Sequence, residues 1–248
     1  MVLSSSLKRS FLTATIMAIV AGLFVGLSLG GAQGGRQKPQ STATLPRVLN
    51  ETTALRITAV ESQTIGTSVG TVISLQNVSN KTVKAYSIAH GKKWTTRNLF
   101  LADEAIAPNQ INQYIATPGD ESVDYTVVAV QFEDGTCEGK PVFTYRLNEI
   151  YGGMQEQARA ILPCLKKLDT VKGLRQESLI ADCENLAAQL AVKGRTSDYS
   201  DGLTNAQAAF LTQIQDVKAK VKANNLMDAV ASKDRALKIA QTLTRSSQ

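Results

Sequence analysis

The chain has 248 residues, of which 43% are hydrophobic and 19% charged, and its formal net charge is +6. Its three cysteines are too few for a disulfide scaffold. In the C-terminal half the basic residues alternate with acidic ones in nearly equal number, which is typical of a solvated helical surface and argues against a nucleic-acid partner.

The N-terminal segment has the features of a targeting signal. Lys8 and Arg9 precede residues 11–32, which contain no charged side chain. A basic start, an apolar stretch and small residues before Gln33 are the layout of a secretory signal. About 20 apolar residues also suffice to span a bilayer, so we expect residues 1–32 to be a signal peptide or a membrane anchor. Either way the rest of the chain is expected outside the cytoplasm, periplasmic or secreted, or tethered by a single span.

The apolar run has a second pattern. Small residues recur at every fourth position, the spacing that lets transmembrane helices approach closely. If the run is retained as an anchor, this stripe predicts a homodimer; if it is cleaved, the stripe reflects only the small-residue content of signal peptides. The positions are Ala18, Gly22, Gly26 and Gly30.

Residues 33–52 are rich in Gly, Gln, Ser, Thr and Pro, which predicts a flexible linker. Residues 53–146 then hold short segments rich in Val, Ile, Thr and Tyr, separated by turn sequences, which predicts antiparallel strands in a β-sandwich. Val127 to Val130 run without a polar interruption, so that strand is expected to be covered on both faces. The predicted strands are ALRITAV, GTVISLQNV, KTVKAYSI, INQYIA and DYTVVAVQFED, the last followed by an Asp-Gly hairpin signal.

One stretch of this region carries a resemblance. SLQNVSNKTVKAYSI is a strand ending in Asn, a Ser-Asn turn and a return strand, and VAVQFEDGT follows further on. With these segments, residues 55–146 resemble the immunoglobulin-like β-sandwich domains of uncharacterised exported bacterial proteins. Such domains carry no common activity, and the Cys…Trp…Cys spacing of antibody domains is absent. Asn50, Asn77 and Asn80 also begin Asn-X-Ser/Thr sequences, which we interpret as turn residues.

After Leu147 the apolar period changes to between three and four residues, which predicts a helical region over 147–245. We expect two helical hairpins, which could pack together as a small four-helix bundle. Pro163 is expected to kink the first helix or break its last turns, and Gly173 and Gly194 are expected to stop helices. Thr204 and Gln207 form a capping-box pattern at the start of the third helix. The predicted stripes are Leu147, Ile150, Met154, Ala158, Ile161, Leu165 and Leu168; Leu179, Cys183, Leu186 and Leu190; Phe210, Ile214, Val217 and Val221; and Leu226, Val230, Leu237 and Ala240.

The candidate binding residues are few. Trp94 lies in HGKKWTTR beside Lys92, Lys93 and Arg97, and an aromatic ring among cations in a loop could bind a glycan or an acidic group. The competing interpretation is that Trp94 fills the sandwich core. His90 is expected to be an exposed loop residue.

Carboxylates occur in three turn segments, at 103–104, 120–124 and 133–134. Adjacent residues on a strand point to opposite faces, so these pairs are not by themselves the facing dyad of a glycosidase. No phosphate-binding, metal-binding or nucleophile motif is present, and no cofactor is expected.

Cys164 and Cys183 are the one covalent hypothesis. If the first two helices form an antiparallel hairpin, the two residues come within about one helical turn of each other, at the limit for a disulfide. The alternative is two buried thiols that pack as small apolar groups.

These patterns favour an exported or membrane-anchored protein that is not an enzyme. Its β-sandwich would present a surface to a protein partner or an envelope polymer, while residues 11–32 contact the membrane at least transiently. The alternative is a hydrolase of an envelope polymer whose carboxylates are brought together by the fold.

Overall fold

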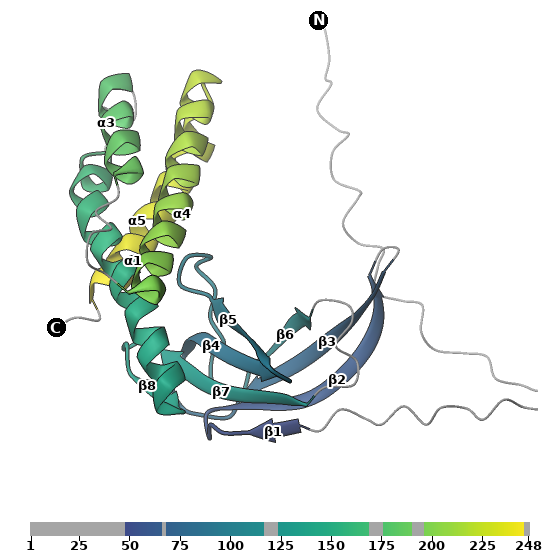
Figure 1. Cartoon of the computed structure of the whole chain (residues 1–248). Helices are drawn as coiled ribbons and strands as arrows, with labels where there is room; N and C mark the ends of the chain where they lie inside the picture. The colour runs from purple at the N-terminus through teal and green to yellow at the C-terminus, as the bar shows by residue number, and fades with distance from the viewer. Residues whose placement is uncertain (1–47, 66–67, 117–123, 169–175, 190–195, 246–248) are drawn as a thin grey trace, which may run out of the picture. The chain divides into compact units, whose positions relative to one another are not determined.

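The computed structural model describes residues 48–65, 68–116, 124–168, 176–189 and 196–245. These ranges contain four α-helices and eight β-strands in two sheets, which confirms the α+β class (Figure 1). Residues 43–248 form one compact unit. The apolar run 11–32 and the linker residues 33–47 lie outside the described residues.

The larger sheet has the strand order β1-β7-β4-β5, and β8 pairs with β7 beside β1. The strand β1 pairs with β7 in parallel, so this sheet is mixed and the expectation of purely antiparallel strands was wrong. Residues 48–50 had been assigned to the linker; they are a strand because Leu49 and its neighbours extend alongside the start of β7. The bounds are β1 Val48–Asn50, β4 Val83–His90, β5 Lys93–Asn98, β7 Tyr125–Phe132 and β8 Cys137–Gly139.

The smaller sheet is antiparallel, in the order β2-β3-β6. It is built from β2 Leu55–Ile65, β3 Ser68–Asn77 and β6 Ile111–Ala116. With β4 and β7, these strands confirm all five segments predicted from their Val, Ile, Thr and Tyr content. The strand β5 was missed, because KWTTRN is polar and was interpreted as a loop.

The two sheets share one apolar core. Leu55, Ile73 and Leu75 of the smaller sheet pack in the same cluster as Ile88 and Val127 of the larger one. All eight residues of β7 are buried, as expected for a strand covered on both faces. The second cover is helical, because Ala85 and Ala129 belong to the core of the helices.

Asn77 fixes the corner between the two sheets. It is fully buried, and its Nδ2 donates to the carbonyls of Lys81 (2.8 Å) and Ile106 (2.7 Å). Its Oδ1 accepts from the amide (3.0 Å) and hydroxyl (2.7 Å) of Ser79. The Asn77 side chain therefore supplies hydrogen-bond partners for backbone groups at this chain reversal that have no partner within either sheet.

The helical region begins earlier than expected. Helix α1 starts at Pro141 rather than near Leu147, because proline suits the first helical position, where no amide donor is needed. The boundary between strands and helices therefore falls at Lys140. Helix α1 also continues one turn past Pro163 to Lys167, so the proline does not remove its last turns. The helices are α1 Pro141–Lys167, α3 Glu177–Ala188, α4 Ser197–Lys222 and α5 Leu226–Arg245.

The expected capping box was wrong. Thr204 lies inside α4, which starts at Ser197 and is capped by Thr196, whose hydroxyl accepts from the amide of Tyr199 at 3.2 Å. The predicted helix stops at Gly173 and Gly194 lie outside the described residues.

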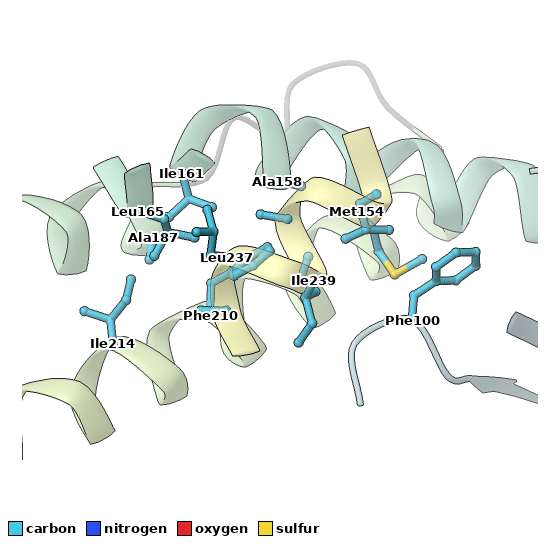
Figure 2. Packing of buried hydrophobic residues seen from close by; sticks show 14 of the residues in the cluster. Phe100, Met154, Ala158, Ile161, Leu165, Ala187, Phe210, Ile214, Leu237 and Ile239 are labelled. Carbon is cyan, nitrogen blue, oxygen red and sulfur yellow. The ribbon is translucent and has the colours of Figure 1, made fainter. Parts of the chain in front are cut away.

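The four helices share one core, in which α3 and α5 both pack against the pair α1–α4. The stripe predicted for α1 is buried there except for Ile150, which is half-buried. In the stripe predicted for α3, Cys183 is buried as expected, but Ile180 and Ala187 are buried in place of Leu179 and Leu186, which lie at the rim. Leu190 lies outside the described residues. Figure 2 shows this core, with Phe100 lying beside Met154 at one end.

Two glycines bring α1 and α4 into backbone contact. A Cβ on Gly153 would collide with the carbonyl oxygen of Tyr199, and a Cβ on Gly202 would collide with the carbonyl oxygen of Ile150. Because both obstacles are backbone atoms, no rotamer change could make room. The crossing of these helices therefore depends on the missing side chains.

Within the described ranges, no helix has the length and apolar character needed to cross a membrane.

Candidate functional site

Trp94 lies on β5, an edge strand of the larger sheet, and its side chain is exposed to 38%. The interpretation of Trp94 as a core residue was therefore wrong. The reason is the position of β5 at the edge of the sheet. There the ring packs against the first turns of α1, a segment about 50 residues away in sequence.

The neighbours of Trp94 are Phe143 and Arg146. Phe143 meets the indole edge-on, with ring centroids 5.8 Å apart. The guanidinium of Arg146 stands over the indole ring, 4.5 Å from its centroid, in a cation–π arrangement. Arg146 is oriented from its other side by Asp198 of α4, at 3.7 Å from Nε.

The cations expected beside Trp94 lie elsewhere. Side chains alternate along a strand, so Lys93 and Arg97 point to the face of β5 opposite to Trp94. Burial raises the pKa of Tyr86, a residue of the core between the sheets, and the positive charge of Arg97 opposes this rise. Arg97 therefore lies on the Tyr86 side of β5. Lys92 occupies the turn before β5. The structure therefore separates the predicted cluster and gives Trp94 a different cation, Arg146.

More exposed apolar surface lies on the turns of α1 that contact Trp94. Val142 and Tyr145 are each exposed to 57%, and their spacing of three residues places them on the same side of α1 as Arg146. Buried apolar side chains are usual in a helix that packs on a sheet, so two exposed ones beside an exposed Trp form a distinct surface. We call Trp94, Val142, Phe143, Tyr145 and Arg146 the aromatic patch.

His90 is not an exposed loop residue, which corrects the expectation from the sequence. It ends β4, is 8% exposed and stacks on Tyr125 with ring centroids 6.1 Å apart. Its Nε2 lies 3.4 Å from the hydroxyl of Thr95 on the neighbouring strand. These contacts are those of a histidine that packs within the sheet.

Two of the described carboxylates of the three turn segments pair with lysines. Asp103 pairs with Lys238 of α5 at 2.8 Å, and Asp134 pairs with Lys81 at 2.8 Å. The hydrogen bond from Lys81 and those from Thr136 lower the pKa of Asp134 to about 2. A general acid needs a raised pKa, so Asp134 is tuned in the wrong direction for that role. Residues 120–123 lie outside the described residues.

Cys164 and Cys183 form a disulfide that joins α1 to α3, with Cα atoms 5.6 Å apart. This is the pairing considered from the sequence. The third cysteine, Cys137, is half-buried, and its thiol lies 3.1 Å from Oδ1 of Asn148. Burial, with a smaller contribution from Asp134, raises the pKa of the Cys137 thiol to about 12, which keeps it protonated and unreactive.

A serine, a lysine and an aspartate also meet between α4 and α5. The hydroxyl of Ser232 donates to Asp216 (2.6 Å), and the ammonium of Lys220 donates to both of them (2.7 and 2.8 Å). The two donors lower the pKa of Asp216, so its carboxylate is a poor acceptor for the proton of a serine nucleophile. Ser232 is buried as well, so we interpret this network as a link between the helices.

The lysines near the end of α4 face acids. Lys218 contacts Glu184 of α3 at 2.5 Å, and Lys220 contacts Asp216. This pairing reduces the free charge of the cluster that begins at Lys218 and ends at Lys222.

In the part of the chain that the structure describes, no group of three or more His, Cys, Asp or Glu residues could hold a metal ion. Comparisons with models of protein families, with curated proteins and with solved structures found no match. The aromatic patch is thus the candidate site with the clearest geometry.

Sequence reasoning found Trp94 but missed its partners. Phe143 and Arg146 lay in a segment interpreted as strand and turn, and nothing local links them to residue 94. One signal was available, because Pro141 followed by apolar residues at 142, 143 and 147 fits the first turns of an amphipathic helix.

Proposed function

We propose that this chain is an exported protein, not an enzyme, that binds a protein partner through the aromatic patch. The observation that carries the proposal is the pairing of exposed Trp94 with Arg146 beside two further exposed apolar side chains. Trp, Tyr and Arg are the residues that most often dominate the energy of protein interfaces. Arg146 is already held in place by its aromatic and acidic neighbours, so little side-chain freedom is lost on binding.

The patch suits a protein surface better than an envelope glycan. A sugar binds tryptophan by lying on the ring face, and the guanidinium of Arg146 already covers one face of Trp94. A partner with an apolar side chain next to a carboxylate would fit both parts of the patch, since Arg146 binds carboxylates in a fork geometry.

The location outside the cytoplasm belongs to the same proposal. It is supported by Lys8 and Arg9 before the uncharged run 11–32, and by the disulfide between Cys164 and Cys183, which suits an oxidising compartment. The mass of the intact protein in soluble and membrane fractions of its native host tests this part. A chain starting at Gln33 indicates a cleaved signal, a full-length chain in the membrane indicates an anchor, and a full-length chain in the cytosol overturns the proposal.

We also propose that the two sheets are an immunoglobulin-like sandwich, of the kind found in uncharacterised exported bacterial proteins. Their common core supports this relation. The parallel pair β1–β7 departs from the fully antiparallel pattern and marks where this chain would differ.

The alternative function, an envelope hydrolase, has less support. Asp103 and Asp134 each pair with a lysine from a different element, and the pKa of Asp134 is low. A hydrolase would need two carboxylates about 5–9 Å apart across a cleft.

Photocrosslinking in the native host tests partner binding. A photoreactive amino acid replaces Tyr145 in the patch or, as the control, Met227 at the start of α5, which is 85% exposed. We expect one discrete adduct from position 145, none of that mass from position 227, and loss of the adduct when Trp94→Ala or Arg146→Glu is added. The same adduct from both positions, or an adduct that survives both substitutions, contradicts the proposal.

Trp94 is the only tryptophan, so its fluorescence reports on the patch directly. Titration with purified envelope polysaccharide is expected to leave the emission unchanged. A saturable shift would favour the envelope-binding interpretation over the protein partner.

A further inference from the structure

The strand β6 is an edge strand unlike the others of the described sheets. It pairs with β3 on one side and is the outer strand of the smaller sheet. Edge strands are commonly protected from pairing with other chains by shortness or by charged side chains. The strand β6 has six residues, INQYIA, with no charge and no proline.

The remaining edges carry these protections. The strands β1 and β8 have three residues each. The strand β5 carries Lys93 and Arg97, and β2 carries Arg56 and Glu61. Among the edges that the structure describes, β6 is thus the long one without charge.

The outward face of β6 is apolar as well. Ile111 and Ile115 are each exposed to 57%, with Gln113 between them. Tyr114 and Ala116 point the other way and pack against the core between the sheets. The outward neighbours on β3 are uncharged too; they are Gln76, Ser74 and Val72, opposite Ile111, Gln113 and Ile115 respectively.

We propose that β6 pairs antiparallel with β6 of a second copy of this chain, about a twofold axis through Gln113. In this register Ile111 lies opposite Ile115 of the second copy, and Gln113 lies opposite its own counterpart. The two small sheets then become one continuous sheet of six strands.

The register follows from the side-chain alternation. A shift by one residue would place an outward side chain opposite an inward one, so only even shifts are compatible with a twofold axis. A shift by two would leave Ile111 opposite Gln113. Only the register centred on Gln113 places each isoleucine against another isoleucine.

The outward side chains favour a second copy. They read Ile, Gln, Ile in either direction along β6, so a twofold axis through Gln113 places Ile111 against Ile115 and Gln113 against its counterpart. On this face of the described sheet the charged side chains are Arg56 and Glu61, which lie two strands away on β2. The edge is therefore compatible with itself. This inference does not depend on the aromatic patch, which lies on β5 and α1.

Disulfide crosslinking of the full chain in its native host tests the pairing. In a Cys137→Ser background, Gln113→Cys places two thiols with their Cα atoms about 4.5–5.5 Å apart, within the limit for a disulfide. The matched control is Ser74→Cys, which lies beside Gln113 on β3. Its counterpart is three strand spacings away, about 14 Å, which is too far. An added oxidant takes up the two electrons and two protons that the thiols lose.

We expect Gln113→Cys to give at least tenfold more crosslinked dimer than Ser74→Cys. Adding Ile115→Lys should reduce the yield to the control level, because each lysine then lies opposite Ile111 of the second copy and replaces an apolar cross-strand pair by a charge against an isoleucine. Adding Met227→Lys, at an exposed residue of α5 outside the aromatic patch, should leave the yield unchanged. Circular dichroism of each variant verifies the fold.

The proposal is overturned if Gln113→Cys crosslinks no more than Ser74→Cys, or if Ile115→Lys leaves the yield intact in a folded chain. Its failure is distinct from failure of partner binding, because the photocrosslink at Tyr145 is measured in a chain with an unaltered β6.

Discussion

The sheets and the helices of this protein are held together in different ways. Between the sheets, the chain reversal after β3 is fixed by polar groups, above all by the buried side chain of Asn77. Between the helices, the α1–α4 crossing is fixed by the absence of side chains at Gly153 and Gly202, and α3 is attached by a disulfide. The difference teaches that similar apolar cores need different devices to select one arrangement. Strands need partners for their turns, whereas helices need a shape that allows close contact.

The largest expected effect is at the helix crossing. Gly153→Ala would place a methyl group against the backbone of Tyr199, and we expect it to lower the free energy of unfolding by about 3 kcal/mol or more. Urea denaturation followed by circular dichroism measures this.

The neighbouring glycine is the control. A Cβ on Gly152 would meet only the side chain of Tyr199, at 3.1 Å from Cε2, so the ring needs to give by only a few tenths of an ångström. Alanine is also the better helix former by about 1 kcal/mol, so Gly152→Ala should change stability little or raise it. Equal losses from both substitutions would show that backbone contact is not what fixes the crossing.

The next prediction concerns the disulfide that attaches α3 to α1. Cys164 and Cys183 are 19 residues apart in sequence, and closing a loop of this size stabilises by about 3 kcal/mol. Reduction with dithiothreitol should therefore lower the urea midpoint, with α3 showing the fastest amide hydrogen exchange. The variant Cys137→Ser should respond to reduction in the same way, because Cys137 takes no part in the disulfide. Identical midpoints for the oxidised and reduced protein would contradict this prediction.

The polar corner of the sheets comes next. Asn77→Ala leaves the carbonyls of Lys81 and Ile106 without their buried donor, and we expect a loss of about 2 kcal/mol. Asn80 lies exposed in the same turn, so Asn80→Ala should stay within about 0.5 kcal/mol of the parent chain. If the two variants lose the same stability, the turn is held by something other than the Asn77 side chain.

The smallest effect concerns the exposed pair between Lys81 and Asp134. The hydrogen bond from Lys81 lowers the pKa of Asp134 to about 2, below the value of about 3.9 in an unfolded chain. Its stabilisation is thus present above pH 4 and is lost as the pH falls towards 2. Both side chains are about half exposed, so we expect Asp134→Asn to cost only about 0.5 kcal/mol at pH 7 and nothing at pH 2. A cost that persists at pH 2 would point to lost packing instead of lost charge.

The sequence by itself determined much of the local structure. Short segments rich in Val, Ile, Thr and Tyr marked β2, β3, β4, β6 and β7, since such side chains suit a strand that buries one or both faces. Apolar stripes marked the helices, because their period is set by the helix itself. The Cys164–Cys183 pair could be considered from the same helical spacing.

The tertiary structure decided what depends on distant partners. Trp94 acquired Arg146 instead of Lys93, because the strand turned the lysine to the opposite face and brought α1 alongside. Residues 48–50 became a strand only because β7 offered an edge. The importance of Gly153 came from the backbone of another helix. Contacts of this kind join segments far apart in the chain, so no local pattern of residue types encodes them.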